Sequence, residues 1–286
     1  MNNINELQNS KRILKALFAQ RYLYSKAKKY EVAIFIMIIL SCLIAKITYI
    51  GEQYILICAM IILIVGRILE KIKEKDFEKA AVIQEYIDRK IYGFDIEKQR
   101  IDKYSIDEIE NIVKFINLRH KKRAELQMNF SGDSKEHGVK DWYVGIDKNI
   151  ERRVAIYKCQ TQNTGWDRSN NDTYKKIIKI FEVAMLVLII LAFKMSWYSL
   201  ILAILEPIAS IMNFENKSKD FEDISIEIET LEKRIDIDNI NVEDLKDIQN
   251  KIFERRKLGY AVPDFIDKLK SKELHEIYKE EQDGKK

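Results

Sequence analysis

Two apolar runs near the N-terminus decide the fold: VAIFIMIILSCLIAKITYI at residues 32–50 and YILICAMIILIVGRIL at residues 54–69. Only Gly51, Glu52 and Gln53 separate them. A core helix of a soluble bundle usually keeps one polar stripe, whereas these runs are apolar all round. Each run also approaches the length that crosses a hydrocarbon core of about 30 Å. The stretch therefore predicts two transmembrane helices, which so short a link makes antiparallel.

A second pair of apolar runs follows much later: IIKIFEVAMLVLIILAF at residues 177–193 and WYSLILAILEPIASIMNF at residues 197–214. Three residues again link the two runs, so they form a second hairpin. The 286 residues include only 9 Gly and 2 Pro, too few for the turns of a β-rich or loop-rich fold. The predicted fold class is an all-α membrane protein with four transmembrane helices arranged as two antiparallel hairpins.

Lysine and arginine gather at the outer ends of both hairpins, and this asymmetry sets their orientation. The basic residues there are Lys26, Lys28, Lys29, Arg67, Lys71, Lys73, Lys75, Lys175, Lys176, Lys179, Lys217 and Lys219. The turns carry only Lys46 and Lys194. Because basic flanks stay on the cytoplasmic side, we expect a multi-pass protein with both termini in the cytoplasm.

This topology divides the chain into five segments. They are an N-terminal cytoplasmic helix (residues 1–30), a first transmembrane hairpin (31–70), a cytoplasmic helical region (71–176), a second transmembrane hairpin (177–214) and C-terminal cytoplasmic helices (215–286). The middle and C-terminal regions are expected to build a helical domain on the cytoplasmic side.

Capping residues mark helix boundaries inside the cytoplasmic regions. Ser105 followed by Glu108 resembles a capping box that opens a helix to about residue 118. A further helix is expected over about residues 147–162. Another is expected between Asn241, which suits a helix N-terminus, and Gly259, which suits a C-terminal stop.

Apolar residues after the fourth run recur at spacings of three and four. They are Phe221, Ile224, Ile228, Leu231 and Ile235. Such a short heptad seam is typical of a helix that packs inside its own subunit, or of a stalk helix that pairs between subunits. The sequence favours the first interpretation and leaves the second open.

No pattern typical of a catalytic or metal site is visible in the sequence. The histidines are His120, His137 and His275, and the cysteines are Cys42, Cys58 and Cys159. None has companions at the spacing of metal ligands or of a disulfide framework. The net charge of +4 is also too small to indicate DNA or RNA as a partner. We therefore predict a protein that is not an enzyme and holds no metal and no cofactor.

Two carboxylates within the apolar runs are candidate intramembrane polar positions. Glu206 lies mid-run and precedes Pro207. A charge there is costly in lipid unless it faces a cavity, a partner or water. Glu206 is therefore either a packing residue or a position that lines a conduit or subunit interface. Glu182 lies nearer the cytoplasmic end, one turn after Lys179, and an ion pair between the two is expected.

Polar and aromatic residues cluster before the second hairpin. The candidate ligand-binding residues are Lys140, Asp141, Trp142, Tyr143, Arg152, Arg153, Gln160, Asn163, Trp166 and Asp167. Aromatic rings beside arginine can stack on a base while Arg or Lys holds a phosphate. The alternative is that Trp142 and Trp166 anchor the soluble domain to itself or to the lipid headgroups.

Short motifs spread along the chain resemble those of one family. They are Gln8, Ala19-Gln20-Arg21, Tyr24-Ser25-Lys26-Ala27-Lys28, Lys140-Asp141-Trp142-Tyr143, Cys159-Gln160, Asn163, Trp166-Asp167, Tyr174, Ile248-Gln249, Ile252, Arg255-Arg256 and Val262-Pro263-Asp264. Their order around two hydrophobic hairpins resembles the SMODS-associated four-transmembrane effector family of bacterial antiphage systems. The chain departs from the family pattern at Val144, where Pro is frequent, and at Arg168, which directly follows Asp167.

The resemblance implies a pore-forming effector in the bacterial inner membrane. In such systems a CD-NTase-type synthase makes a cyclic nucleotide, which would activate the effector. The effector would then oligomerise, permeabilise the membrane and stop growth, as in abortive infection. The implied partners are the lipid bilayer, further copies of the chain and the cyclic nucleotide. The alternative function is a non-conducting membrane scaffold or sensor that recruits a partner through its cytoplasmic helices.

Overall fold

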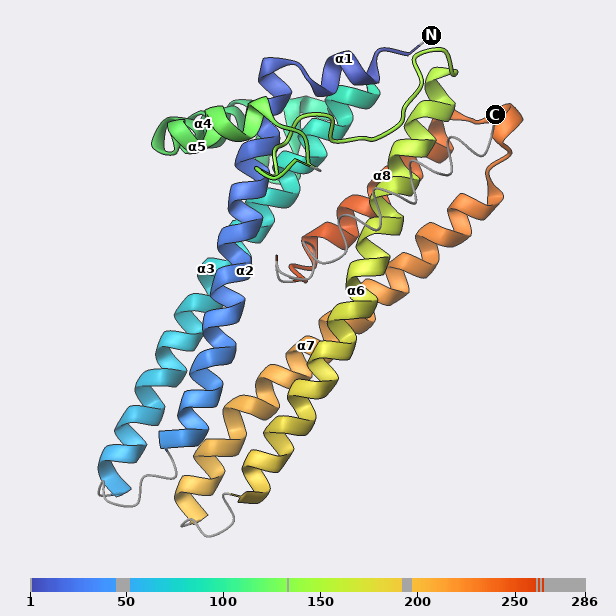
Figure 1. The fold of residues 1–286 in the computed structure, drawn as a ribbon. Coiled ribbons are helices and arrows are strands. Elements are labelled where there is room, and N and C mark those ends of the chain that lie inside the picture. Colours follow the sequence, from blue (N-terminus) through green and yellow to red (C-terminus); the bar gives the residue numbers. More distant parts are fainter. Residues whose placement is uncertain are drawn as a thin grey trace.

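Four long helices form the frame of the molecule. The computed structural model describes residues 2–44, 52–132, 134–191, 197–260, 262 and 264. The long helices are α2 (Lys11–Ile44), α3 (Glu52–Tyr92), α6 (Arg152–Leu191) and α7 (Trp197–Arg234). They pair as two hairpins, α2 with α3 and α6 with α7, whose connected ends lie at the same end of the molecule (Figure 1). The predicted helical fold is confirmed, because the described residues contain only one pair of two-residue strands beside the helices.

Each long helix combines an apolar run with a polar continuation in one rod. We call the ends that carry the apolar runs the distal halves; their described parts are residues 32–44, 52–72, 177–191 and 197–214. We call the opposite end the head. Among the residues that the structure describes, no helix has an apolar stretch long enough to span a membrane.

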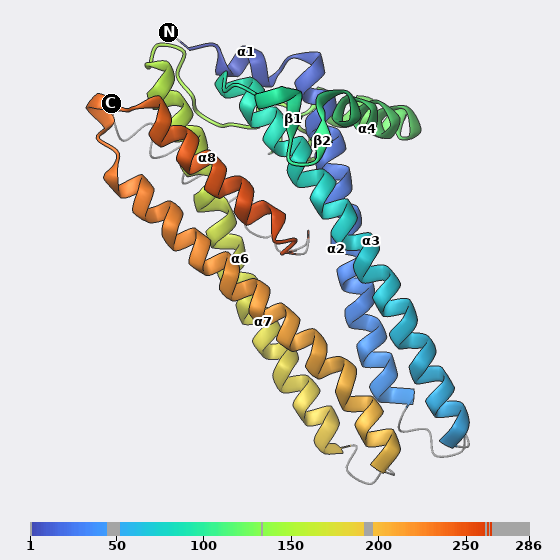
Figure 2. The ribbon, with the colours of Figure 1, turned by 180° about the vertical axis from the view of Figure 1, so that it is seen from behind.

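The head is built where the other ends of the long helices meet shorter elements (Figure 2). These are α1 (Ile4–Gln8), α4 (Ile106–Arg119), α5 (Lys121–Asn129), α8 (Val242–Lys257), the antiparallel strands β1 (Arg100–Ile101) and β2 (Tyr104–Ser105), and the 3-10 turns η1 (Glu97–Gln99) and η2 (Ile237–Asn239). A single apolar cluster holds most of them together and includes Leu17, Ile83, Ile109, Ile156 and Leu245, each at most 4 % exposed. Burial of this apolar surface is the main favourable term for the head.

Local capping signals position α4 and α8 as predicted. The Ser105 hydroxyl accepts a hydrogen bond from the Glu108 amide, and the Glu108 carboxylate accepts one from the Ser105 amide. The Asn241 side chain likewise accepts from the backbone of Glu243 at the start of α8. Gly259 follows α8 with a φ of +65°, a backbone conformation that favours glycine.

The helix expected over residues 147–162 differs in the structure. Instead, α6 begins at Arg152 and continues unbroken into the second hairpin. The Asn2 side chain donates to the carbonyls of Asp147 and Ile150, and the Asn5 side chain donates to the carbonyl of Ile146. These carbonyls are therefore occupied by the N-terminal segment and do not start a helix. Asn2 and Asn5 lie about 140 positions away in the chain, so the local sequence around residues 146–150 cannot predict these hydrogen bonds.

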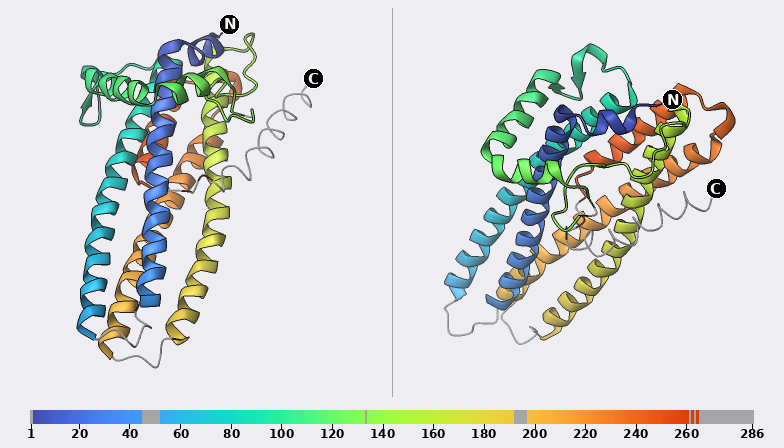
Figure 3. Two further views of the ribbon diagram at one scale, coloured as in Figure 1. Left: turned by 60° about the vertical axis from the view of Figure 1, so that its left-hand side comes forward. Right: turned by 45° about the horizontal axis from the view of Figure 1, so that its top comes forward.

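Helix α8 packs against both hairpins and occupies the space between their head ends (Figures 2 and 3). Ile224 and Ile228 on α7 contact Ile248 and Ile252 on α8 in one apolar cluster. The heptad seam therefore packs inside its own chain, as the sequence favoured. Since α8 joins α3, α6 and α7, it is the element that holds the two hairpins in register in the head.

Candidate functional site

A cavity of about 520 Å³ lies in the head, where the two hairpins meet. Its walls come from α2, α3, α5, α6, α7, α8 and the segment after α5; one representative of each is Tyr24, Phe77, Gln127, Trp166, Phe221, Arg256 and Trp142. The volume lies in the range of pockets that enclose small-molecule ligands. Because both hairpins line the cavity, a bound molecule would contact both.

One wall is an irregular segment over residues 130–144 that a glycine and an arginine hold in place. A Cβ atom on Gly138 would lie 1.6 Å from the Phe130 carbonyl oxygen, so only glycine fits there. From α2, the Arg21 guanidinium donates to the carbonyl oxygens of His137 (2.7 Å) and Gly138 (2.6 Å). The first helix of hairpin 1 thus fixes this wall.

Side-chain amides clamp the same segment further along, at residues 141–144. The Gln8 side chain accepts from the Tyr143 amide at 2.7 Å and donates to its carbonyl at 3.2 Å. On the other side, the Gln162 side chain pairs with the backbone of Val144 in the same two-way manner. These side-chain amides bond to the backbone N–H and C=O groups of Tyr143 and Val144, much as a neighbouring β-strand would. Without them, these backbone groups would lack hydrogen-bond partners.

A buried carboxylate organises the polar floor of the head. Asp88, on α3, accepts from the Tyr143 hydroxyl at 2.7 Å and from Arg256 Nη1 at 2.7 Å. Gln249 donates to the same carboxylate at 3.3 Å. The Tyr143 hydroxyl in turn accepts from Asn163, on α6, at 3.0 Å. These contacts join α3, α6 and α8 through residues that are mostly buried.

The charge of Arg256 is maintained by this carboxylate. Burial is the largest single effect and opposes the charged form of Arg256, but Asp88, together with Tyr24, Tyr143 and Glu85, outweighs it and raises the pKa of the guanidinium. Burial also raises the pKa of the Tyr143 hydroxyl, and Asp88 adds to that shift. Arg256 therefore stays a guanidinium, and Tyr143 is a neutral donor.

A second arginine from α8 faces the cavity from another side. Arg255 donates through Nη2 to the Asp167 carboxylate at 2.6 Å, and its guanidinium lies 5.0 Å from the centre of the Phe221 ring. Burial lowers the pKa of Arg255, and Asp167 opposes that shift. Arg255 thus links α8 to both helices of hairpin 2.

Basic side chains at the rim complete the chemistry of the cavity. Arg123 and Lys140 are exposed, and neither forms an ion pair with a described carboxylate. Lys28 lies at the rim too and pairs with Asp264 at 2.9 Å. The cavity thus combines accessible cations with the aromatic rings of two tryptophans, the side chains that suit a phosphate-bearing ligand with planar bases.

The chain matches the model of one known protein family. The model of the SMODS-associating 4TM effector domain matches residues 2–280. The chain belongs to this family. Comparisons with curated proteins and with solved structures gave no match. Membership assigns this 4TM effector domain to an effector role in SMODS-type antiphage systems.

Most of the predicted ligand-binding residues of this 4TM effector lie together at the cavity. Those that line it are Lys140, Asp141, Trp142, Tyr143, Asn163, Trp166 and Asp167. The ring of Tyr143 is buried, and its hydroxyl serves the Asp88 network described above. Asp141 is held by Asn9, whose side chain donates to its carboxylate at 2.7 Å.

Three predicted residues are placed elsewhere. Arg152 donates to the Asn3 side chain and to the Ile91 carbonyl. Arg153 donates to the Ile240 carbonyl at 3.0 Å. Gln160 is fully buried against α8, where it donates to the Leu245 carbonyl at 2.8 Å. All three hold the helices of the effector together and do not line the cavity.

Sequence reasoning missed the cavity residues that other elements supply. Arg123 is the main example, because α5 is far from the cluster in sequence and nothing in its own segment marks it. Arg21, Arg255 and Arg256 lay within motifs of the family resemblance but were assigned no role. The motifs marked these three arginines as candidates, but only the tertiary fold shows that they line one cavity.

Glu206 and Glu182 are the two predicted intramembrane polar positions. The backbone at Glu206 belongs to α7, but its side chain lies outside the described residues, so its role remains a prediction. Glu182 is half-buried on α6, and the structure records no ion pair between it and Lys179 among the described residues.

Proposed function

We propose that the chain is a membrane effector of bacterial antiphage defence that a cyclic nucleotide activates. In this proposal the distal halves insert into the inner membrane as two hairpins, and the head stays in the cytoplasm with both termini. A nucleotide from a CD-NTase-type synthase binds the head cavity. Activated copies then assemble and permeabilise the membrane, which stops growth of the infected cell.

The exposure of large apolar side chains along the distal halves carries this proposal. Ile36 on α2, Ile61 on α3, Ile180 on α6 and Met212 on α7 are 52 %, 54 %, 71 % and 58 % exposed, and they have many apolar neighbours with similar exposure. A soluble monomer rarely exposes so extended an apolar surface, because burial of apolar area is favourable. Lipid tails would cover this surface on all four helices at once.

The position of the cavity supports activation by a ligand. It lies at the head ends of both hairpins, so a ligand that binds one hairpin arrangement better than another shifts the population toward it. A single chain with four membrane helices is too narrow for a wide pore, so permeabilisation calls for several copies. The alternative function, a non-conducting scaffold or sensor, would need another partner surface than the heptad seam, because Ile224 and Ile228 of the seam pack against α8.

The proposal is tested by membrane integrity in cells. The chain is expressed with its cognate synthase, and entry of a membrane-impermeant dye is followed after phage infection. Dye entry that needs both proteins is the expected result. Growth arrest with an intact membrane would rule out permeabilisation and favour the scaffold. Recording from planar bilayers that contain the purified chain and a panel of cyclic di- and trinucleotides separates a defined channel from a non-conducting sensor.

Replacement of both Arg123 and Lys140 by Ala is expected to weaken binding of the active cyclic nucleotide at least tenfold. Each side chain contributes a charge-assisted hydrogen bond to phosphate, which is worth about 1.5–3 kcal/mol. Calorimetric titration measures the change. Arg153→Ala is the matched control, since Arg153 is partly exposed but bonds to the Ile240 carbonyl outside the cavity. Equal losses in both variants would remove the cavity from consideration as the binding site.

Trp166→Ala is expected to weaken the same binding by roughly five- to a hundredfold, since stacking of a base on an aromatic ring is worth about 1–3 kcal/mol. Trp166→Phe keeps a ring and should retain most of the affinity. Intrinsic fluorescence is a second readout, because two of the three tryptophans, Trp142 and Trp166, line the cavity. If Trp166→Ala binds the cyclic nucleotide as tightly as the parent does, the proposal that a base stacks on Trp166 is wrong.

A further inference from the structure

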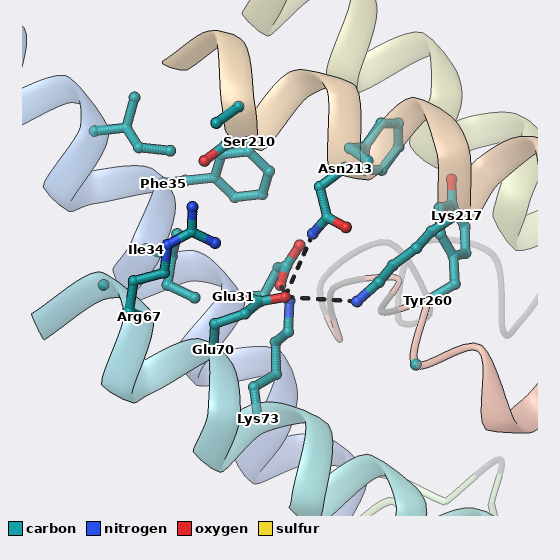
Figure 4. Close-up of a pocket in the computed structure, with 15 residues that line it drawn as sticks. Glu31, Ile34, Phe35, Arg67, Glu70, Lys73, Ser210, Asn213, Lys217 and Tyr260 are labelled. Carbon is teal, nitrogen blue, oxygen red and sulfur yellow. Dashed lines mark hydrogen bonds and ion pairs between the residues drawn. The ribbon is translucent and has the colours of Figure 1, made fainter. Parts of the chain in front are cut away.

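A cluster of charged side chains joins the two hairpins where the distal halves meet the head (Figure 4). Lys73 on α3, only 4 % exposed in its side chain, pairs with Glu31 on α2 and lies 2.7 Å from Glu70. From the other hairpin, Lys217 on α7 lies 3.5 Å from Glu70 and 3.4 Å from Glu74. We call these five residues the junction cluster.

Lys73 keeps its charge in this arrangement. Burial disfavours the charge on Lys73, but Glu31 and Glu70 outweigh it and raise the pKa of the ammonium group. The Glu70 carboxylate lies 2.7 Å from Lys73 on its own helix and 3.5 Å from Lys217 on α7. Glu70 therefore shares its charge between a lysine of its own hairpin and a lysine of the other hairpin. Loss of Lys217 removes the ion pairs across the hairpins and leaves those of Lys73 in place, while Asn213 on α7 still donates to Glu70 at 3.5 Å.

One aromatic ring separates this cluster from the ligand cavity. Tyr260, just after α8, lines both the head cavity and a small cavity of about 60 Å³ at the junction cluster. Its ring centre lies 5.3 Å from that of Phe221 in the wall of the head cavity, and 5.3 Å from that of Phe214 in the wall of the small cavity. A ligand that displaced the Tyr260 ring would disturb the packing beside Lys217.

The small cavity has room for little more than a pair of water molecules. The hairpins must therefore separate at this level before anything larger could pass between them. From these observations we propose that the junction cluster is a latch that opposes the active arrangement, and that the head cavity acts on it through Tyr260. This inference rests on the proposed function and adds the regulation of the same site. A contact that exists in one arrangement and is broken in another biases the population against the second.

Lys217→Gln tests the latch in vesicles of phosphatidylethanolamine and phosphatidylglycerol that contain the full chain and a self-quenching dye. Without nucleotide, the variant is expected to release dye about five- to tenfold faster than the parent, the range of a modest allosteric coupling. Lys175→Gln is the matched control, because Lys175 pairs with Glu222 at 2.6 Å inside hairpin 2. An unchanged rate for Lys217→Gln, in a preparation whose parent responds to nucleotide, overturns the latch.

A cross-link gives the opposite test. The double variant Glu74→Cys/Lys217→Cys is joined with a short bifunctional maleimide after Cys42 and Cys58 are replaced by Ala. Cys159 can remain, since it is buried and burial raises the pKa of its thiol, which keeps it unreactive. The cross-link should abolish nucleotide-dependent release, and a cross-linked protein that still releases dye overturns the inference.

Failure of the proposed function gives a different pattern. If no variant releases dye with any cyclic nucleotide, permeabilisation itself is wrong. Spin labels on the two hairpins then test the junction cluster directly through the distance between them. A longer or broader distance distribution in Lys217→Gln supports the latch, and a distribution identical to that of the parent overturns it.

Discussion

Replacement of Asp88 by Ala is expected to lower the free energy of unfolding of the head by about 3–5 kcal/mol, the cost of breaking a buried ion pair from one side. The carboxylate is 1 % exposed and accepts hydrogen bonds from Tyr143 and Arg256, each at 2.7 Å, and from Gln249 at 3.3 Å. Its loss leaves the Arg256 guanidinium charged and buried without a partner. It also removes the acceptor of the Tyr143 hydroxyl in the cavity wall.

Thermal unfolding of the purified chain in detergent measures this loss. Glu227→Ala is the control, because Glu227 forms an ion pair of 2.6 Å with Lys251 between α7 and α8 at an exposed position. Pairs of that kind contribute about 0–1 kcal/mol. Similar changes in melting temperature for the two variants would show that the Asp88 network is not a principal stabilising feature of the head.

Local signals in the sequence predicted the framework well. The capping box at Ser105 and the Asn241 cap join residues within three positions of each other, so a short stretch of sequence contains both hydrogen-bond partners. The apolar runs predicted which parts of the long helices would lack a polar face. Most of the large apolar side chains that are exposed in the structure lie in these parts.

The cavity could be predicted only in part, because its walls join segments far apart in the chain. Gln160 and Asn163 lie three residues apart on α6, but packing against α8 buries Gln160, while Asn163 reaches Tyr143. Arg152 and Arg153 were predicted to bind phosphate. In the structure, Arg152 instead donates to the Asn3 side chain next to α1, and Arg153 donates to the Ile240 carbonyl before α8. A basic residue in an isolated sequence does not reveal whether a carbonyl from elsewhere already occupies it.

Ile61→Asp is expected to prevent stable membrane association of the first hairpin. Ile61 lies in the middle of the run at residues 54–69 and is 54 % exposed. A carboxylate at the centre of a membrane helix costs about 2.5–3.5 kcal/mol, whereas isoleucine there is favourable by a few tenths. The difference of roughly 3–4 kcal/mol is more than a hundredfold in the partition between membrane and water. Resistance to carbonate extraction from cell membranes measures it.

Ile226→Asp makes the same chemical change on the head part of α7, where Ile226 is 57 % exposed. In water an exposed isoleucine at such a site can be replaced at a cost of about 0.5 kcal/mol or less. The two positions therefore match in residue type and exposure and differ only in the solvent that the proposed function assigns to them. Loss of extraction resistance and of dye entry in Ile61→Asp alone places lipid around the distal halves. Equal behaviour of both variants would mean that protein or water, and not lipid, surrounds Ile61.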